Sequence, residues 1–365
     1  MSRCVRRLGT EKADGEVPGR KENQRARALY EEIFPEDDRA FLDYYFQVKA
    51  EENEIYVVEE TQTDEILATL HLNPYPVQFC RSRVDTAYIV AVATREDCRH
   101  QGLMTSLLKS SLCRLYEKKS PFAWLMPAAE AIYYPFGFRF IYQKNQMRIN
   151  RRMSDGDRKA ELSCRIAEEQ DLEELEAFAA AMLPNIAQVY AVHDRAYFAQ
   201  RLQELNCEGG SLVLYCVKGR ICGFFLASVR EKQAWEIVVE QAYEAEAKDA
   251  LLDWFGLQDS EIKITAFPPS WELGQSCMQV PAVMGRIVHL EQFVQCLCSP
   301  EEKEWQIHLQ DDLIAENNGT FRISVGRTGG SLVRLAECGP DVREMGIGTL
   351  MEEIFDVSVW LNEVV

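Results

Sequence analysis

The stretch that decides the fold is Tyr88-Ile-Val-Ala-Val-Ala-Thr94, then Arg95–Cys98, then Arg99-His-Gln-Gly-Leu-Met-Thr105. Its apolar run is typical of a buried strand, and the apolar spacing from Met104 to Glu117 is typical of an amphipathic helix. The loop between them contains Gly102, so backbone N–H groups can turn inward beside a helix N-terminus and form a cradle for a pyrophosphate. Arg99 can add charge-assisted hydrogen bonds. The alternative is a helix that merely begins with a glycine turn.

Outside this stretch, turn residues and prolines indicate that the chain is divided into three segments of mixed helices and strands. In the first, the expected elements are Cys4–Leu8, Ala26–Phe34, Arg39–Lys49, Glu54–Glu59, Ile66–Leu72, Ala87–Ala93, Met104–Glu117, Phe122–Met126, Ala128–Tyr134 and Phe138–Tyr142. In the second they are Asp171–Met182, Ser211–Val217, Ile221–Val229 and Ala242–Gly256. In the third they are Met284–Cys298, Trp305–Ile314, Gly319–Val325, Ser331–Ala336 and a helix followed by Val357–Leu361. This apolar ending either docks against the body or is an ordinary last core strand.

Composition narrows the function classes. The 365 residues carry a formal net charge of −18, which argues against a nucleic-acid partner and favours cationic ones, although acidic side chains can equally serve solubility alone. No stretch reaches the length of a membrane span, and the N-terminal sequence lacks the apolar core of a signal, so we expect a cytoplasmic protein that does not use a membrane. The 12 cysteines lack zinc-site spacing, so we expect reduced thiols and no metal.

A second motif follows the first: Leu125-Met-Pro-Ala-Ala-Glu-Ala-Ile-Tyr133-Tyr134-Pro-Phe136-Gly137-Phe138. The loop at Arg99-x-x-Gly102-x-Met104 resembles the acetyl-CoA loop of the GCN5-related N-acetyltransferases, Arg/Gln-x-x-Gly-x-Gly/Ala after a strand. The second motif resembles Ile-Tyr-x-x-Phe-Gly-Tyr/Phe of the Eis-type (enhanced intracellular survival) branch, which has Leu or Met at the last loop position. Together the two motifs carry a resemblance that extends over nearly the whole chain.

This resemblance implies an α+β fold in three parts. Residues 1–150 would form an acetyltransferase domain, residues 151–283 a degenerate second copy, and residues 284–365 a domain similar to sterol carrier protein. The middle segment lacks an Arg-x-x-Gly-x-Gly/Ala loop, as a degenerate copy requires, and a sterol-carrier fold need not bind lipid. Eis-like proteins are often hexamers, so the resemblance also implies a homo-oligomer.

By the same resemblance, Tyr133 is the general acid and the terminal carboxylate of Val365 the general base. Acyl transfer to an amine needs a base to take its proton and an acid to protonate the departing thiolate. Glu363 is a competing base. The residues that the resemblance assigns to the acetyl-CoA cosubstrate are Val92, Ala93, Thr94, Arg99, His100, Gln101, Gly102, Leu103, Met104 and Thr105.

The expected activity is acetyl transfer to an amine of a cationic small molecule, similar to an aminoglycoside or a polyamine, or of a lysine in a peptide. The alternative is a protein that binds or senses acyl-CoA or a hydrophobic ligand without turnover. Tyr134 and four histidines (His71, His193, His289 and His308) are interpreted as structural or surface residues. Three carboxylates are weighed as ammonium contacts against a solvated helix face: Glu31, Glu32 and Asp37.

Overall fold

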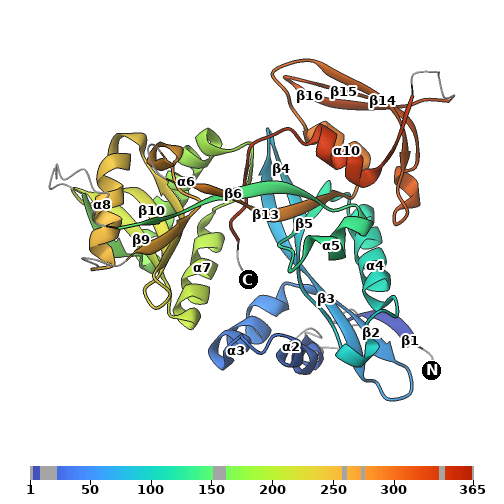
Figure 1. Cartoon of the computed structure of the whole chain (residues 1–365), viewed down its shortest axis with the longest axis horizontal. Coiled ribbons are helices and arrows are strands. Elements are labelled where there is room, and N and C mark those ends of the chain that lie inside the picture. The colour runs from blue at the N-terminus through green and yellow to red at the C-terminus, as the bar shows by residue number, and fades with distance from the viewer. Residues whose placement is uncertain are drawn as a thin grey trace.

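The computed structural model describes residues 3–8, 23–150, 162–256, 261–272, 276–336 and 342–363. It contains a 14-stranded sheet and a separate 4-stranded sheet, with helices on both (Figure 1). The architecture is therefore mixed α and β. No helix in the described ranges has the length and apolar character needed to cross a membrane.

The N-terminal half of the large sheet holds the two sequence motifs. Its order β1-β2-β3-β4 is antiparallel, and β5 then joins β4 in parallel. The strands are β1 (Arg3–Arg7), β2 (Glu54–Glu60), β3 (Ile66–Phe79), β4 (Ser82–Thr94), β5 (Phe122–Leu125) and β6 (Arg139–Ile149). The helices are α2 (Arg27–Ile33), α3 (Arg39–Gln47), α4 (Leu103–Glu117) and α5 (Glu130–Tyr133), with short 3₁₀ turns η1 (Gln24–Ala26), η2 (Lys49–Glu51), η3 (Glu96–Cys98) and η4 (Tyr134–Phe136).

Strand β3 is longer than the sequence predicted, because it continues through Pro74 and Pro76. Its pairing with β2 ends at Leu72, and its pairing with β8 begins at Val77. The two prolines lie in this gap, where their missing N–H groups remove no ladder bond on that side. The prediction that this strand ends at Leu72, before the two prolines, is therefore wrong.

Apart from the short strand β8 between its first two helices, the middle part repeats the order of the first: strand, two helices, three antiparallel strands, helix, strand. Its strands are β7 (Leu162–Ile166), β8 (Val189–Ala191), β9 (Ser211–Val217), β10 (Arg220–Ser228), β11 (Gln233–Val239) and β12 (Ile262–Thr265). Its helices are α6 (Leu172–Ile186), α7 (Arg195–Glu208) and α8 (Glu244–Trp254), with turns η6 (Glu169–Asp171), η7 (Gln241–Tyr243) and η8 (Pro269–Glu272). The sequence predicted neither α7 nor β11.

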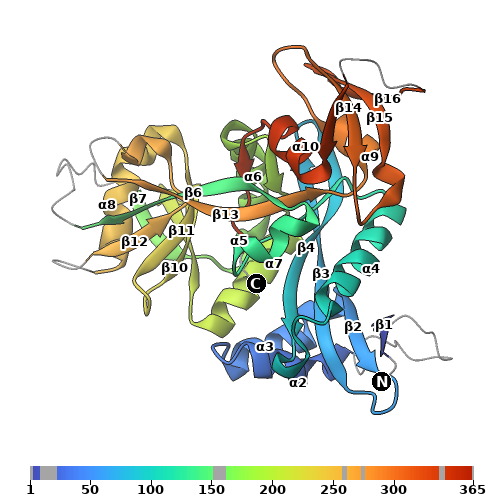
Figure 2. The ribbon, with the colours of Figure 1, turned by 45° about the vertical axis from the view of Figure 1, so that its right-hand side comes forward.

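Strand β13 (Met278–Ile287) joins the two halves of the large sheet. It pairs antiparallel with β5 on one side and with β6 on the other, and β6 in turn pairs with β12 (Figure 2). The expected domain boundary between residues 283 and 284 falls inside this strand. The division into three domains stays a prediction.

The C-terminal part carries the small sheet, in the order β16-β15-β14-β17. Its elements are α9 (Leu290–Cys296), β14 (Lys303–Gln310), η9 (Ala315–Asn317), β15 (Gly319–Gly326), β16 (Gly329–Arg334), β17 (Arg343–Gly346) and α10 (Ile347–Ile354). The chain then returns to the large sheet as β18 (Val359–Trp360), which pairs in parallel with β8. The described part of the tail after β18 lies in the middle of the molecule, between α7 and the long strands β3 and β4 (Figure 1). The expected docking of the apolar ending is confirmed as far as Glu363.

Candidate active site

Strand β4 opens away from β5 just before the first motif. The two strands pair only at Ala87 and Tyr88. Further along, Ala91 has a left-handed backbone (φ 51°), and the register with β3 shifts between Thr69 and His71, which marks a β-bulge. Beyond Tyr88, none of the described strands pairs with this edge of β4. Its backbone groups through Thr94 therefore face a gap between diverging strands.

The loop behind β4 delivers an uncapped helix start to that gap. His100 (φ 59°) and Gly102 (φ 77°) both adopt the left-handed conformation, which turns the chain into α4. No side chain caps the helix, and its first turn holds no acidic residue. The first intrahelical bond is donated by Ser106 to the Gly102 carbonyl, so the amides of the first turn remain available to an anion.

The structure brings the predicted cosubstrate residues together around this helix start. Leu103 is buried and anchors the helix in the core, and Met104 is half-buried. The exposed members are Arg99, His100, Gln101, Gly102 and Thr105, while Ala93 is buried and Val92 and Thr94 are half-buried. The Arg99 side chain donates to the Thr94 carbonyl at 3.4 Å, and a side chain at Gly102 would meet nothing within 4 Å. This arrangement fits a pyrophosphate: free amides, one basic side chain and open space.

The corresponding helix of the middle part is different. Helix α8 also follows a strand with a left-handed bulge residue, Glu236 (φ 51°) in β11. However, its first turn carries Glu244 and Glu246. Two carboxylates at a helix N-terminus already satisfy its positive potential and repel a phosphate. The start of α8 is therefore less suited to an anion than the start of α4.

Tyr133 lies at the end of α5, at 7% exposure, with its ring edge-on to Phe138 at 5.9 Å. Burial raises the pKa of the Tyr133 phenol to about 12, so it carries its proton at neutral pH. No hydrogen bond to its hydroxyl is found among the described residues. Its neighbour Tyr134 points elsewhere: it is 40% exposed, and its hydroxyl donates to Glu352 of α10 at 3.2 Å.

The C-terminal tail reaches the same region from the middle part. Asn362 (2% exposed) and Glu363 (0%) are buried, with Tyr142 donating to Asn362 at 3.2 Å and Tyr197 to Glu363 at 3.3 Å. The pKa of Tyr88 in β4 is raised by burial and then by the charge of Glu363, with a smaller contribution from Tyr133. Tyr88, where β4 leaves β5, therefore lies within electrostatic range of both Glu363 and Tyr133. Val365 lies outside the described residues.

Sequence reasoning missed one group near the tail. His193, Glu236 and Glu363 offer ligand atoms that lie within 4.8 Å of one another, and all three side chains are buried. His193 was interpreted as lacking a partner, and nothing in the sequence marked Glu236. The only local signal was the apolar ending, which placed Glu363 on a docked segment.

Of the three carboxylates weighed as ammonium contacts, Glu32 lines a pocket with Arg95, Glu96 and Asp97, in the loop that follows β4. Glu31 and Glu32 are exposed on α2, and Glu31 pairs with Arg27 at 2.6 Å. Asp37 accepts from the Tyr30 hydroxyl at 2.8 Å, and burial raises its pKa. A solvated helix face therefore describes Glu31, whereas Asp37 lies in the turn after α2 and is half-buried.

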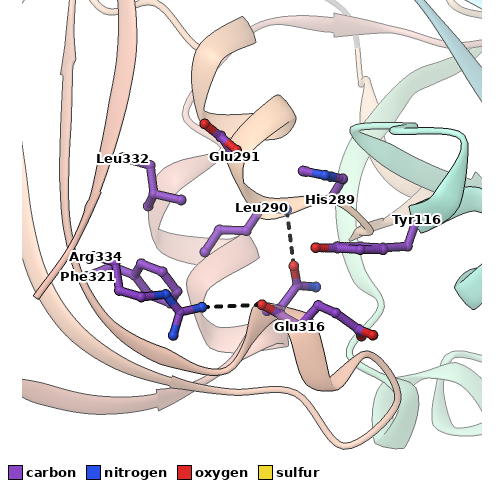
Figure 3. Close-up of a pocket in the computed structure, with 9 residues that line it drawn as sticks. Tyr116, His289, Leu290, Glu291, Glu316, Phe321, Leu332 and Arg334 are labelled. Atoms are coloured by element: carbon purple, nitrogen blue, oxygen red, sulfur yellow. Dashed lines mark hydrogen bonds between the residues drawn. The ribbon is translucent and has the colours of Figure 1, made fainter. Parts of the chain in front are cut away.

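A separate pocket of about 230 Å³ lies where α4 meets the C-terminal part (Figure 3). The rings of Tyr116 and His289 stack on one side at 4.5 Å, and Arg334 donates to the Glu316 carbonyl on the other at 3.5 Å. No residue predicted for catalysis or for the cosubstrate lines this pocket. It is distinct from the gap between β4 and β5.

Comparison with known proteins finds a family match in the part of the chain that holds β4, the start of α4 and Tyr133. Residues 19–141 match the model of the acetyltransferase (GNAT) domain. None of the curated proteins matches the sequence. A solved structure from Enterococcus faecalis, described as a probable N-acyltransferase, is 15% identical and has a TM-score of 0.79, covering 97% of this chain and 90% of its own.

Two further solved structures share the fold over almost the same length. A GCN5-related N-acetyltransferase from Kribbella flavida is 16% identical, with a TM-score of 0.74 over 95% of this chain and 88% of its own. Eis1 from Mycobacterium abscessus is 15% identical, with a TM-score of 0.68 over 96% of this chain and 89% of its own. Residues 19–141 therefore form an acetyltransferase domain of the GNAT class, and the chain has the fold of an N-acetyltransferase enzyme.

Proposed function

We propose that the protein is an Eis-type N-acetyltransferase that moves the acetyl group of acetyl-CoA to an amine of a cationic small molecule, of the aminoglycoside or polyamine class, or of a lysine side chain. The observation that carries this proposal is the open edge of β4 facing the uncapped start of α4. This edge can present backbone N–H groups to the acetyl oxygen, and the helix start can hold the pyrophosphate.

The proposed roles of the cosubstrate residues follow from their placement. The amides of Leu103, Met104 and Thr105, at the start of α4, would hold the pyrophosphate. Arg99 lies beside them, exposed, with its guanidinium free to turn from the Thr94 carbonyl toward a phosphate. The half-buried Val92 and buried Ala93 would line the path of the acetyl group along β4.

Tyr133 is proposed as the general acid. Its O–H would pass a proton to the sulfur that leaves when the amine attacks the acetyl carbon. Because burial holds its pKa at about 12, the phenol stays protonated over the whole working pH range, so it is an acid and not a base. The matching base is the terminal carboxylate of Val365, ionised at its ordinary pKa of about 3.5. Glu363 is buried two residues earlier and is assigned a different role below.

The fold supports the three-part reading behind this proposal. Apart from β8, the middle part repeats the order of elements of the first, and its helix α8 carries Glu244 and Glu246 where α4 carries no acid. A degenerate second acetyltransferase unit explains both facts. The C-terminal part is proposed to be similar to sterol carrier protein, and the active protein to be a cytoplasmic homo-oligomer, as hexameric Eis-like proteins are.

The test is amine-dependent thiol release from acetyl-CoA with aminoglycosides, polyamines and lysine peptides. We expect Tyr133→Phe to lower kcat by between about 10² and 10⁴, while the affinity for acetyl-CoA measured by calorimetry stays the same. Tyr134→Phe is the matched control, because the same hydroxyl is removed one residue away, and it should leave kcat within about twofold of wild type.

Two outcomes contradict the proposal. Tight acetyl-CoA binding without release for any amine would mean an acyl-CoA sensor. Absence of acetyl-CoA binding would remove the assignment of the α4 loop. Adding one glycine after Val365 separates the base from the acid: kcat should fall in the extended protein, and an unchanged kcat would show that the terminal carboxylate is not the base.

A further inference from the structure

We propose that His193 and Glu236 are positioning residues that fix the C-terminal tail by holding the side chain of Glu363. This inference rests on the proposed function, because the position of the tail matters for activity only if the chain end takes part in acetyl transfer. His193, Glu236 and Glu363 are called the tail cluster below. Its consequence is that the middle part, whose helix α8 is less suited to an anion, serves as the dock for the tail.

The tail cluster joins three segments far apart in sequence. His193 lies between β8 and α7, Glu236 lies in β11, and Glu363 lies in the tail. Their exposures are 4%, 1% and 0%. His193 Nε2 lies 2.6 Å from Glu236 Oε1, and the ligand atoms of all three residues lie within 4.8 Å of one another. Glu363 Oε1 accepts from Tyr197, whereas its Oε2 is buried with no hydrogen-bond partner among the described residues.

The hydrogen bonds of His193 require a proton inside the cluster. Its Nδ1 lies 2.6 Å from the Ala191 carbonyl, and a carbonyl can only accept, so Nδ1 carries a hydrogen. Its Nε2 faces a carboxylate oxygen, which is also an acceptor unless it is protonated. One proton must therefore sit between His193 and Glu236. That proton makes the His193–Glu236 pair neutral overall, so the second buried carboxylate, Glu363, does not face an unbalanced negative charge.

A proton fits this geometry better than a metal ion does. Ligand atoms bound to zinc at 2.0–2.2 Å are about 3 Å apart or more, whereas Nε2 and Oε1 are 2.6 Å apart. Cations already face the cluster. Burial lowers the pKa of Lys144 of β6 and of Lys49 of η2, and the charge of Glu363 partly offsets this lowering. Burial also opposes the charge of Arg201, but the charges of Glu204, at 2.7 Å, and Glu363 contribute to a raised pKa. A divalent ion would add positive charge beside them.

The backbone at Glu236 adopts an unusual conformation, and its side chain contacts His193. Glu236 has φ 51° in the middle of β11, a conformation that costs about 1–3 kcal/mol for a residue with a side chain and that clusters at functional sites. The first part has the same left-handed bulge at Ala91, next to the proposed acetyl-CoA edge. In the middle part, the bulge presents a carboxylate to His193 and the tail.

Docking of Glu363 restricts the segment that follows it. The Glu363 side chain is 0% exposed, and a side chain held in the core limits how far the next residues can move. In the proposed function those residues carry the general base, and a misplacement of about 1 Å can lower a rate roughly 10²-fold.

The proton of the tail cluster also predicts a pH dependence. Burial lowers the pKa of His193, but the charge and hydrogen bond of Glu236 raise it above its ordinary value of 6.5 overall, and burial followed by the charge of Glu236 raises the pKa of Glu363. Both groups hold their proton more tightly when the tail is docked, so docking is favoured at low pH and weakens as the pH rises through the raised pKa values.

Several other titratable groups surround the Glu363 carboxylate. The charged ones are Glu236, His193, Arg201, Lys144 and Lys49, and the phenols are Tyr75, Tyr88, Tyr142 and Tyr197.

The experiment compares the full-length wild type with His193→Asn, Glu236→Gln and Glu363→Gln. Asp171→Asn is the matched control, since Asp171 is a buried carboxylate that pairs with Arg165 at 2.6 Å in the same part of the fold but away from the tail. The first readout is amide hydrogen exchange of the peptide covering residues 357–363. The second is kcat and KM for acetyl-CoA.

We expect His193→Asn and Glu363→Gln to speed tail exchange roughly 100-fold or more, as loss of one partner of a buried charged group does. In the same variants kcat should fall roughly 10²-fold with KM for acetyl-CoA unchanged. Glu236→Gln can still accept a hydrogen bond from His193 and leaves the Glu363 side chain unchanged, so its effects on tail exchange and kcat should be smaller. The wild-type tail, corrected for intrinsic exchange, should lose protection above pH 6.5, and His193→Asn should show no such step.

Unchanged tail exchange in all three variants overturns the inference, as does an effect equally large in Asp171→Asn. One equivalent of tightly bound metal that disappears in His193→Asn would overturn the shared proton. If wild type shows no amine-dependent transfer, the proposed function fails, and the exchange readout still decides whether His193 and Glu236 hold the tail.

Discussion

Replacing Arg286 with methionine should destabilise the protein more than any exposed ion-pair change. Arg286 and Asp311 are both 0% exposed in their side chains and are joined by a 2.5 Å bond. The guanidinium also donates to the carbonyls of Phe136 at 2.7 Å and Ile287 at 2.8 Å. The substitution leaves the Asp311 charge buried without its partner, which typically costs about 3–5 kcal/mol.

The structure places the expected loss at the lower end of that range. Asp311 keeps three other donors: the backbone amides of Leu313 and Ile314 at 3.0 and 3.1 Å, and the Asn317 side chain at 3.0 Å. These bonds still solvate part of the charge. We therefore expect about 3 kcal/mol, which corresponds to a fall in Tm of roughly 4 °C when all 365 residues unfold together.

Scanning calorimetry of three variants tests this reasoning. Arg286→Met should show the full loss, and Arg286→Met with Asp311→Leu should recover part of it, because no unpaired charge remains. Arg220→Met is the control: Arg220 is half-exposed in its ion pair with Glu240, and its loss should change stability by about 1 kcal/mol or less. A Tm for Arg286→Met equal to that of Arg220→Met would refute the argument, as would a double variant less stable than the single one.

Three further predictions concern substitutions at buried positions and their effect on the free energy of unfolding. Burial lowers the pKa of His71 to about 3, so the folded protein keeps it neutral while the unfolded chain binds a proton below about pH 6.5; urea unfolding should show wild type losing about 2 kcal/mol between pH 6.5 and 5 through this group, a loss absent from His71→Gln. In Gly223→Ala, the new methyl would lie 2.6 Å from the Val238 carbonyl oxygen, so the free energy of unfolding should fall by about 1–3 kcal/mol, whereas Gly219→Ala, with nothing within 4 Å, should show only backbone strain of about 1 kcal/mol. Leu107→Ala empties a 0% exposed site on α4 and should cost about 2–5 kcal/mol; a loss below 1 kcal/mol in urea titration would show that α4 is not part of the core.

The local part of the site could be predicted from the sequence. A strand, a glycine loop and a helix in immediate succession are set by a short stretch of residues, and the structure places β4, the left-handed Gly102 and α4 where that stretch indicates. The mixed α and β architecture followed from the same kind of pattern. The roles of Tyr133 and Val365 stay predictions.

Other elements could not be predicted, because charged residues occupy some of their buried positions. Helix α7 buries Arg201 and Glu204 as a pair, so its sequence lacks a clean apolar face. Strand β11 carries Glu236 in its middle, which interrupts the strand pattern. The tail cluster depends on contacts between residues up to 170 positions apart, and no local pattern can signal such a contact.

The strand β13 has a consequence for how the protein can be divided. It fills the space between β5 and β6, so the edge strand of the acetyltransferase part is completed by residues more than 150 positions downstream of it. A fragment that stops at Asn150 would expose the hydrogen-bonding groups of both strands to solvent and to other copies, which is the usual route to edge-to-edge aggregation. During synthesis, the segment with the two motifs emerges before β13, so β5 and β6 lack their shared partner strand until β13 is made. The large sheet is therefore completed late in synthesis, when strand β13 joins its two halves.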